Sequence, residues 1–351
     1  MKVGVLTFHR CINYGSYWQT RCLAGGLRAQ GHEVEVLDHS ADDVARAELN
    51  CALQPGLPAR TPAADLPSYK AKVRRFVSAF ESLPLSKPFP LHQPEAAGRY
   101  DAIVIGSDEV WNFRHPWYNG KPLFFGEGLQ TERLLSYAAS FGNYPAEDGM
   151  GRDWSERLQR FAAISVRDGN SRELVEQATG RRADVTLDPC LQFSEFARDD
   201  RSGQGEYALV YGHSFPGWFG AMLRNWAQHR RLKLVSVGYS NAWADVQIID
   251  AGPLEFARLI GGSAAVATNF FHGSVFALLN GRPWVAAPSD YRSIKLRGLA
   301  ALVGADHRIV SERTADAELR ELLATPREQA VAERIIEMRS SSEAYLNAAL
   351  A

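Results

Sequence analysis

The sequence predicts an α/β protein made of two domains, each with a parallel β-sheet covered by helices on both faces. Short runs rich in valine, isoleucine and leucine alternate with longer amphipathic stretches, which is typical of such sheets. The chain has 351 residues, more than one hydrophobic core usually fills. Strand–loop–helix junctions at residues 2–30 and 264–280 predict two sheets whose loop edges face each other across a cleft.

The positions of the apolar runs give the expected elements and domain limits. Strands are expected at residues 2–7, 33–38, 102–105, 134–139, 162–166 and 184–187, and then at 207–211, 233–237, 246–250, 264–268, 283–287 and 308–310. Pro189 and the polar stretch 194–206 mark a boundary, which gives domains at 1–190 and 191–326. Residues 327–351 predict a helix that packs back on the first domain. The proline-rich residues 54–67 predict a surface loop or lid.

Composition narrows the class of protein. A share of 46% hydrophobic and 23% charged residues is ordinary for a globular protein. The net charge of -1 gives no bulk attraction to nucleic acid. The cysteines lack metal-ligand spacing, so we expect a reduced compartment and no metal site. The chain opens without a secretory signal, and polar residues interrupt its most apolar region, 264–287. We therefore expect a cytoplasmic protein without a transmembrane segment.

The first junction carries the loop H-R-C-I-N-Y-G-S at residues 9–16. Gly15 permits close backbone approach, Ser16 is a candidate N-cap, and a helix N-terminus favours an anion. The alternative is a tight turn that only needs a glycine and a cap. The loop is not the G-x-G-x-x-G fingerprint, which argues against a nicotinamide cofactor.

Polar residues also follow two later strands of the first half. Asp108 and Glu109 either cap a helix or act as a base near a hydroxylated substrate, with Trp111 against a sugar face. Arg167 either pairs with Asp168 or binds a carboxylate or phosphate, for which its planar fork is suited.

In the second half, His272 follows an apolar strand in the run F-H-G-S, with Gly273 leaving room for a ligand. A single histidine is usually structural, but this one lies at a polar junction between apolar flanks. Arg292 and Lys295 are spaced to share one side of a helix, where they form either a solvated face or a site for an anionic donor.

These segments together resemble the polysaccharide pyruvyl transferase family. The matching pieces are K-V-G-V-L-T-F-H-R-C-I-N-Y-G at residues 2–15, D-A-I-V-I-G-S-D-E-V-W-N at 101–112, S-Y-A-A-S-F-G at 136–142, S-V-R-D at 165–168, L-D-P at 187–189, F-H-G-S at 271–274 and R-S-I-K at 292–295. They occur in the family's order over residues 2–304.

The resemblance implies a GT-B-like fold of two Rossmann-like domains, and transfer of a pyruvyl group from phosphoenolpyruvate onto a sugar as a ketal. It implies no cofactor beyond that donor, and a glycan or lipid-linked oligosaccharide acceptor reached in the cytoplasm or at the inner face of the membrane. The expected site comprises catalytic His272, Asp108 and Glu109, donor-binding Asn13, Gly15, Ser16, Arg167, Ser274, Arg292 and Lys295, and acceptor-binding Trp111 and Tyr14.

Two positions depart from the family pattern, because some members have an arginine at the position of Phe270 and an aspartate at that of Ser16. Two alternatives follow. One is a GT-B glycosyltransferase that uses a nucleotide sugar, and the other is a glycan- or anion-binding module without catalysis.

Overall fold

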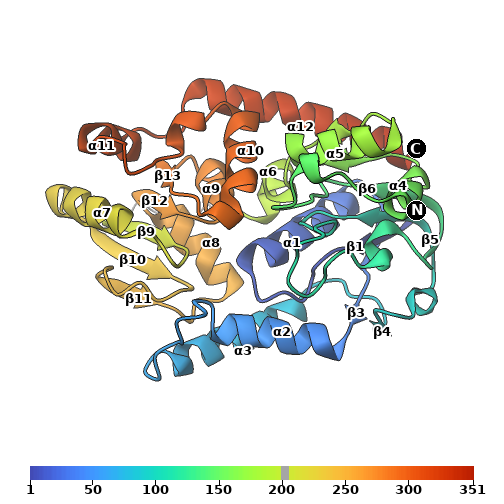
Figure 1. Cartoon of the computed structure of the whole chain (residues 1–351), viewed down its shortest axis with the longest axis horizontal. Helices are drawn as coiled ribbons and strands as arrows, with labels where there is room; N and C mark the ends of the chain where they lie inside the picture. Colours follow the sequence, from blue (N-terminus) through green and yellow to red (C-terminus); the bar gives the residue numbers. More distant parts are fainter. Residues whose placement is uncertain (199–204) are drawn as a thin grey trace. The chain divides into compact units, whose positions relative to one another are not determined.

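The computed structural model describes residues 1–198 and 205–351, and it divides the chain into two compact units (Figure 1). The first unit comprises Met1–Glu48, Phe80–Phe196 and Ile335–Ala351. The second comprises Leu49–Ala79 and Ala197–Arg334. No helix in the described ranges is both long enough and apolar enough to span a bilayer.

The first unit is built on a parallel sheet in the order β2-β1-β5-β6. Single bridges, from Leu135 to Ala163 and from Ala139 to Val166, continue it towards the short pair β7–β8. Its central strands are buried, as expected where helices cover both faces. The strands are β1 (Lys2–Leu6), β2 (Glu33–Val36), β5 (Arg99–Ile105), β6 (Gln130–Ser136), β7 (Ser165–Val166) and β8 (Asp184–Val185). The helices include α1 (Tyr14–Ala29), α4 (Arg152–Gln159), α5 (Gly169–Thr179) and α6 (Pro189–Gln192).

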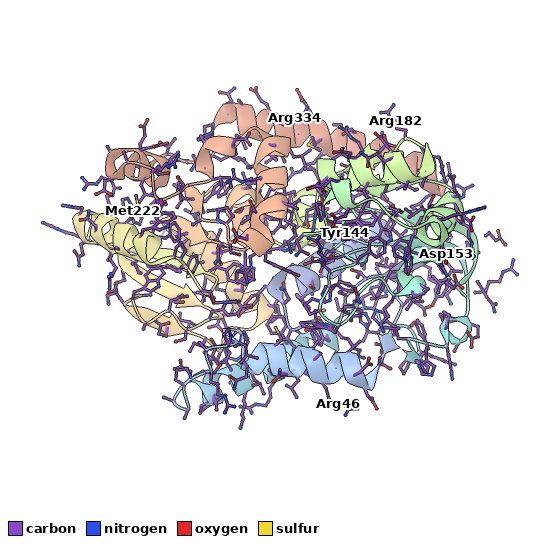
Figure 2. All side chains as sticks on the ribbon, viewed as in Figure 1. Arg46, Tyr144, Asp153, Arg182, Met222 and Arg334 are labelled. Atoms are coloured by element: carbon purple, nitrogen blue, oxygen red, sulfur yellow. The ribbon has the colours of Figure 1, made fainter. Side chains whose placement is uncertain are left out.

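The second unit holds a parallel sheet in the order β11-β10-β9-β12-β13. Buried side chains from β9, β10 and β12 join those of α7 and α11 in one core, and Met222 of α7 packs against it (Figure 2). The strands are β9 (Tyr207–Tyr211), β10 (Lys233–Val237), β11 (Val246–Ile248), β12 (Ala265–Thr268) and β13 (Trp284–Ala286). The helices are α7 (Gly217–Arg230), α8 (Pro253–Gly262), α9 (Phe271–Leu279), α10 (Ser293–Val303) and α11 (Asp316–Ala324).

Each sheet has one place where the strand order reverses. In the first it lies between β1 and β5, and in the second between β9 and β12. Open α/β sheets bind ligands outside the carboxyl ends of the strands at such a switch point. The loops that follow these four strands are therefore the first places to search for a site.

The predicted strands are present apart from residues 308–310, where Ile309 makes only a single bridge to Ala286. A short 3₁₀ turn, Asp306–Arg308, ends at the first residue of that segment. The structure adds a small pair, β3 (His39–Ser40) with β4 (Phe89–Pro90), that the sequence did not predict. Strands of two residues carry too little periodicity to be recognised.

Two helices begin earlier than expected. Helix α1 begins at Tyr14, and its N-cap is Asn13 rather than Ser16, because Asn13 Oδ1 accepts hydrogen bonds from the backbone N–H groups of Gly15 and Ser16. Helix α9 begins at Phe271, so the F-H-G-S run that was expected to follow the strand as a loop is already helical. His272 therefore lies in the first helical turn instead of in the preceding loop.

The segment 49–79, which the sequence analysis placed in the first domain, belongs to the second unit. Its helix α3 (Leu66–Phe80) is held there by polar contacts. The Lys72 ammonium donates to the Gly238 carbonyl at 2.8 Å, and Arg75 forms ion pairs with Asp250 and Glu255. Preceding it are α2 (Asp42–Leu53) and a loop at residues 54–65.

The C-terminal helix α12 (Gln329–Leu350) begins in the second unit and ends in the first. In the first unit, Ser342 Oγ accepts a hydrogen bond from the Leu187 N–H, and the Tyr345 hydroxyl donates to the Ser136 carbonyl. The expected boundary stretch 194–206 falls beside the change of unit at Phe196 and Ala197, although its residues 199–204 lie outside the described ranges.

Candidate active site

The loop after β1 is fixed by a buried carboxylate. Arg10 donates from Nε and Nη2 to the two carboxylate oxygens of Asp38 at 2.6 and 2.7 Å, and His9 Nε2 lies 2.9 Å from Asp38 Oδ1. Burial would raise the pKa of Asp38, but the hydrogen bonds from Arg10 and His9 outweigh it and hold this pKa well below its usual range. His9 and Arg10 thus hold the loop in place.

The same loop reaches the end of β5 through one side-chain hydrogen bond. Ser16 Oγ, in the first turn of α1, donates to Asp108 Oδ2 at 2.7 Å, and Thr7 Oγ1 donates to the Ser107 carbonyl at 2.8 Å. The structure therefore brings together two predicted site residues, Ser16 and Asp108, at the switch point of the first sheet.

The backbone at the end of β5 lies in conformations that side chains disfavour. Asp108 has φ of 79° and Gly106 has φ of 114°, and a Cβ on Gly106 would lie 2.4 Å from the Tyr137 carbonyl oxygen. Non-glycine residues in this region cost free energy and concentrate at functional sites. Asp108 Oδ1 accepts from the Glu109 N–H, and Glu109 Oε2 accepts from Asn112 Nδ2.

Trp111 cannot stack on a sugar as expected, because it is a core residue. Its indole is fully buried, contacts the rings of Phe125, Phe141 and Phe161, and donates to the Phe124 carbonyl at 2.7 Å. Burying a tryptophan with its N–H satisfied stabilises the unit and leaves no free ring face. The other predicted acceptor residue, Tyr14, is the first residue of α1 and is also buried, and its acceptor role stays a prediction.

Arg167, at the end of β7, pairs with a different carboxylate from the one expected. Its Nη1 lies 3.2 Å from Asp188 Oδ2 and 3.4 Å from Gln19 Oε1. Asp168 instead caps α5 by accepting from the Ser171 N–H, and it also accepts from Ser140 Oγ.

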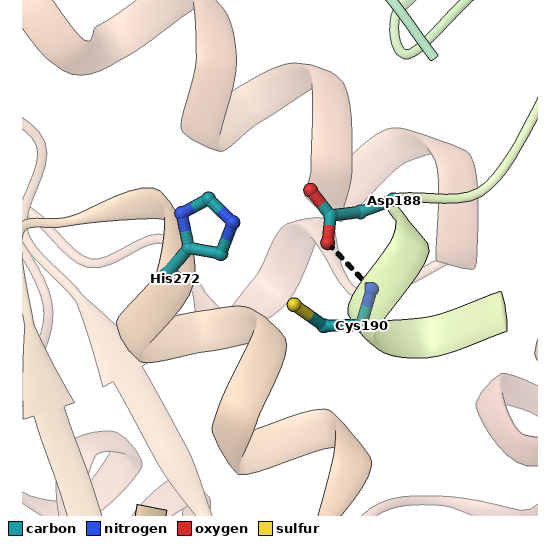
Figure 3. Close-up of side chains that lie close together, drawn as sticks. All are labelled: Asp188, Cys190 and His272. Atoms are coloured by element: carbon teal, nitrogen blue, oxygen red, sulfur yellow. Dashed lines mark hydrogen bonds between the residues drawn. The ribbon is translucent and has the colours of Figure 1, made fainter. Parts of the chain in front are cut away.

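Asp188 has a second role as the N-cap of α6. Its Oδ1 accepts a hydrogen bond from the backbone N–H of Cys190 at 3.0 Å (Figure 3). The Asp188 carboxylate therefore both caps α6 and positions the Arg167 guanidinium.

The second sheet presents its predicted histidine in the first turn of α9, on the strand-to-helix turn after β12 (Figure 3). Nearby, Ser274 Oγ is buried and has no hydrogen-bond partner within the described part of the chain. Buried hydroxyl groups are rarely left unsatisfied, so this one suggests a ligand. Gly273 has a packing role, because a Cβ there would lie 2.2 Å from Thr268 Oγ1.

Arg292 and His213 form a hydrogen-bonded pair beside this turn. Arg292 Nη2 lies 3.1 Å from His213 Nε2, and its guanidinium lies 4.2 Å from the centroid of the Phe270 ring. Arginine can only donate, so His213 Nε2 accepts and Nδ1 carries the proton. Burial, together with the charges of Arg292 and Lys72, lowers the pKa of His213 to about 3, which keeps the imidazole neutral at pH 7. Lys295, in α10, lies over the ring of Tyr291.

Lys72 is the residue that the sequence analysis missed. Its ammonium is buried between the rings of Tyr69 and Tyr239, at 5.0 and 4.4 Å from their centroids. No ion pair to Lys72 is present among residues 1–198 and 205–351. Burial lowers its pKa to about 7. The tyrosine one helical turn before this lysine was the only local signal.

These groups form one aromatic and cationic cluster at the carboxyl edge of the second sheet. Tyr239 stacks on Phe270 with ring centroids 5.2 Å apart, and Phe270 stacks on Tyr211. Lys72 and Arg292 thus lie against rings of the same stack. The faces of aromatic rings attract cations, and the N–H groups of such cations can also donate to anions.

One comparison with known proteins identifies the family. The family model for polysaccharide pyruvyl transferase matches residues 13–291. No curated protein sequence matches the chain.

Comparisons with solved structures agree on the fold. The UDP-GlcNAc 2-epimerase of Neisseria meningitidis bound to UDP-GlcNAc has 11% identity and a TM-score of 0.51, over 97% of this chain and 100% of that one. The S. aureus MnaA–UDP structure has 12% identity and a TM-score of 0.53, over 99% and 96%. The predicted GT-B-like α/β fold is thereby confirmed. The family match covers most of the chain, and the chain belongs to the polysaccharide pyruvyl transferases, a family of transferases of polysaccharide biosynthesis.

Proposed function

We propose that this protein transfers a pyruvyl group from phosphoenolpyruvate to a pair of hydroxyl groups on a glycan, forming a ketal. The observation that carries the proposal is the set of donors at the switch point of the second sheet. Arg292 lies there beside a neutral His213, and Ser274 has an unsatisfied hydroxyl within the described residues. Phosphoenolpyruvate supplies the carboxylate and the phosphate that such donors bind.

The donor is bound, in this proposal, by Arg292, Lys295 and Ser274 of the second unit. The donor-binding roles of Arg167, Asn13, Gly15 and Ser16, in the first unit, stay predictions from the sequence. His272 acts as the general acid or stabilises the departing phosphate. Asn13 already caps α1, and Arg167 is already positioned by Asp188. Both are therefore rigidly held, as binding residues need to be.

The acceptor is deprotonated by Asp108 or Glu109. Asp108 accepts from Ser16 and from the Glu109 N–H, which fixes its carboxylate without neutralising it. Glu109 is partly exposed and is oriented by Asn112. A carboxylate near a hydroxyl can remove its proton as the oxygen attacks.

Atoms balance as follows in the proposed reaction. A proton adds to the donor's methylene carbon, which becomes a methyl group, and positive charge develops at C2. Two acceptor oxygens form bonds to C2, and the bond between C2 and the phosphate oxygen breaks. Of the two hydroxyl protons, one replaces the proton added to the carbon, and the other leaves with the phosphate. No redox partner is required.

The acceptor we propose is a glycan or a lipid-linked oligosaccharide, met in the cytoplasm or at the inner face of the membrane. The acidic and hydroxyl groups around Asp108 favour a polyhydroxylated ligand, because carboxylates accept hydrogen bonds from hydroxyl groups. No cofactor and no metal ion takes part in this proposal.

Replacing His272 with glutamine tests the proposed chemistry. Positioned acid–base groups contribute about 10²–10⁴-fold to rate, so phosphate release from phosphoenolpyruvate with a competent acceptor should fall by that factor. His229→Gln, on the exposed surface of α7, is the matched control and should be unchanged. Turnover of His272→Gln equal to that of the control would reject the catalytic role of His272.

A donor screen separates this proposal from its alternatives. Phosphoenolpyruvate should raise the thermal midpoint of the wild-type protein, whereas UDP should not. Stabilisation by UDP alone would favour a nucleotide-sugar glycosyltransferase instead. Binding of phosphoenolpyruvate and glycan without phosphate release over a broad acceptor set would favour a binding module.

A further inference from the structure

The amino edge of the second sheet contains a cavity of about 250 Å³. Leu232, Ala264 and Pro283, which precede β10, β12 and β13, form part of its wall. The strands of this sheet are parallel, so the cavity lies at the edge opposite to His213 and Asn269. It is therefore separate from the carboxyl-edge residues already described.

Hydrogen-bond donors without partners line this cavity. Neither the Arg230 guanidinium nor that of Arg282 has a hydrogen bond or an ion pair with any described residue. Trp226 also lines the cavity, is only 3% exposed, and its indole N–H has no partner in the same ranges. The indole N–H of Trp226 and Nε of Arg282 are buried, and buried donors ordinarily bind something, so these two groups on one cavity indicate a ligand. Arg230 is exposed and adds a positive charge to the same lining.

Helix capping does not account for Arg282, because other arginines already cap the ends of α9 and α11. Arg230 lies in the last turn of α7, where its charge also suits the helix dipole. Arg308 donates to the carbonyls of Leu322 and Thr325 at 2.9 Å each, at the end of α11. At the end of α9, Arg327 donates to the Leu278 carbonyl and Arg198 to the Leu279 carbonyl. The charges of Arg230 and Arg282 are additional to this set.

The size and the wall of the cavity define what it can hold. Drug-sized ligands occupy pockets of roughly 300–1,000 Å³, so a nucleotide sugar or a glycan chain is too large for this one. Leu232, Pro283 and Leu323 provide apolar surface, and Trp226 provides an aromatic ring. A suitable ligand is a small molecule with one negatively charged end and one apolar end.

We propose that this cavity binds a small organic anion. Its carboxylate or phosphate group accepts hydrogen bonds from Arg230, Arg282 and the Trp226 indole N–H, and its short apolar or aromatic body lies against Leu232 and Leu323. Guanidinium groups suit this role because they match the geometry of both headgroups. The site does not depend on the proposed transferase reaction.

Binding of phenyl phosphate and benzoate by the full-length protein tests the proposal, with titration calorimetry as the readout. We expect one of them to bind with Kd below about 1 mM, and the better probe identifies the headgroup. A hydrogen bond to a charged group is worth about 1.5–3 kcal/mol, so R230Q and R282Q should each weaken binding by about tenfold or more. Trp226→Phe should weaken it less. Absence of binding by both probes would overturn the proposal.

Three controls locate and define the site. R224Q changes an exposed arginine of α7 that does not line the cavity, and it should bind as the wild type does. Benzyl alcohol, which is uncharged, should not bind; binding equal to that of benzoate would overturn the role of charge. If R292Q abolished binding while the R230Q/R282Q double variant retained it, the probe would lie at the carboxyl edge and the proposal would fail.

Discussion

The carboxyl edges of the two sheets occupy equivalent places in their units but differ in chemistry. At the switch point of the first sheet, Asp108 accepts from Ser16, and further along the same edge Arg167 pairs with Asp188. At the switch point of the second sheet, Arg292 donates to a neutral histidine and lies on the Phe270 ring. The first edge is dominated by hydrogen-bond acceptors, and the second edge is dominated by hydrogen-bond donors.

This difference indicates a division of labour. Carboxylates suit hydroxyl-bearing ligands and proton removal, whereas cations and hydroxyl donors suit phosphate and carboxylate groups. We therefore assign binding of the glycan acceptor mainly to the first edge, and binding of phosphoenolpyruvate, the pyruvyl donor, mainly to the second. The two sheets have the same fold type, and the residues that follow their strands give one edge mainly hydrogen-bond acceptors and the other mainly hydrogen-bond donors.

The largest effect should come from removing the base of the first edge. Asp108→Asn keeps the shape of the side chain but cannot accept a proton, so kcat should fall by about 10²–10⁴-fold. Phosphate-release kinetics at saturating donor measure this. Ser16→Ala should cost less, since it removes only the partner of the carboxylate. A fall in kcat for Glu109→Gln, with Asp108→Asn unaffected, would move the base to Glu109.

Arg292→Gln should change donor affinity rather than turnover. It removes charge-assisted hydrogen bonds worth about 1.5–3 kcal/mol, so KM for phosphoenolpyruvate should rise by about ten- to a hundredfold. KM for the acceptor should stay unchanged, which initial-rate measurements with each substrate varied in turn will show. A rise confined to the acceptor KM would reverse the assignment of the two edges.

Lys72 should make stability depend on pH. Its pKa is about 7 in the folded protein against an ordinary value of 10.5. Between these values the unfolded chain holds a proton that the folded protein has released, so the free energy of unfolding rises by up to about 1.4 kcal/mol per pH unit. Below pH 7 the lysine is protonated in both states, so it no longer makes stability depend on pH. The buried charge lowers the free energy of unfolding most in that range.

Urea unfolding at several pH values from 7 to 10 measures this dependence. The wild-type protein should gain stability relative to Lys72→Met as the pH rises, because the methionine variant has no proton to lose. Lys70→Met, exposed on the same helix, should follow the wild type. Parallel pH curves for the wild type and Lys72→Met would show that the lysine keeps its ordinary pKa.

The smallest effect on function should come from Trp111→Phe. It removes the hydrogen bond to the Phe124 carbonyl and part of a packed core, which should lower the free energy of unfolding by about 1–3 kcal/mol. The acceptor KM should remain that of the wild type. A raised acceptor KM with unchanged stability would restore Trp111 to the acceptor site.

The sequence was sufficient to predict where most strands lie and which polar residues follow them, although strands expected to end at residues 139 and 187 end at Ser136 and Val185. Buried parallel strands are continuous apolar runs, so the change to polar residues at His9, Asp108, Arg167 and His272 marks each carboxyl end. The pairing of the charged groups was beyond local reasoning. Asp168 was one of two partners considered for Arg167, the other being a ligand carboxylate or phosphate, but the Asp168 side chain is needed to cap α5.

Two further differences between the sequence-based prediction and the structure arise from contacts between segments that are distant in the sequence. Trp111 is buried by rings at positions 125, 141 and 161, and no spacing around residue 111 reveals them. Lys72 reaches the end of β10 only because α3 packs on the second unit. Tertiary contacts of this kind override local pattern, and they decided which aromatic and which lysine belong to the site.

A crystal structure with phosphoenolpyruvate bound tests the central claim most directly, since it shows which edge holds the donor. We predict that its phosphate and carboxylate groups contact Arg292 and Ser274 at the carboxyl edge of the second sheet, and that R292Q crystals lack this density. Phosphoenolpyruvate bound away from that edge, or a site that takes UDP and excludes phosphoenolpyruvate, would contradict the account.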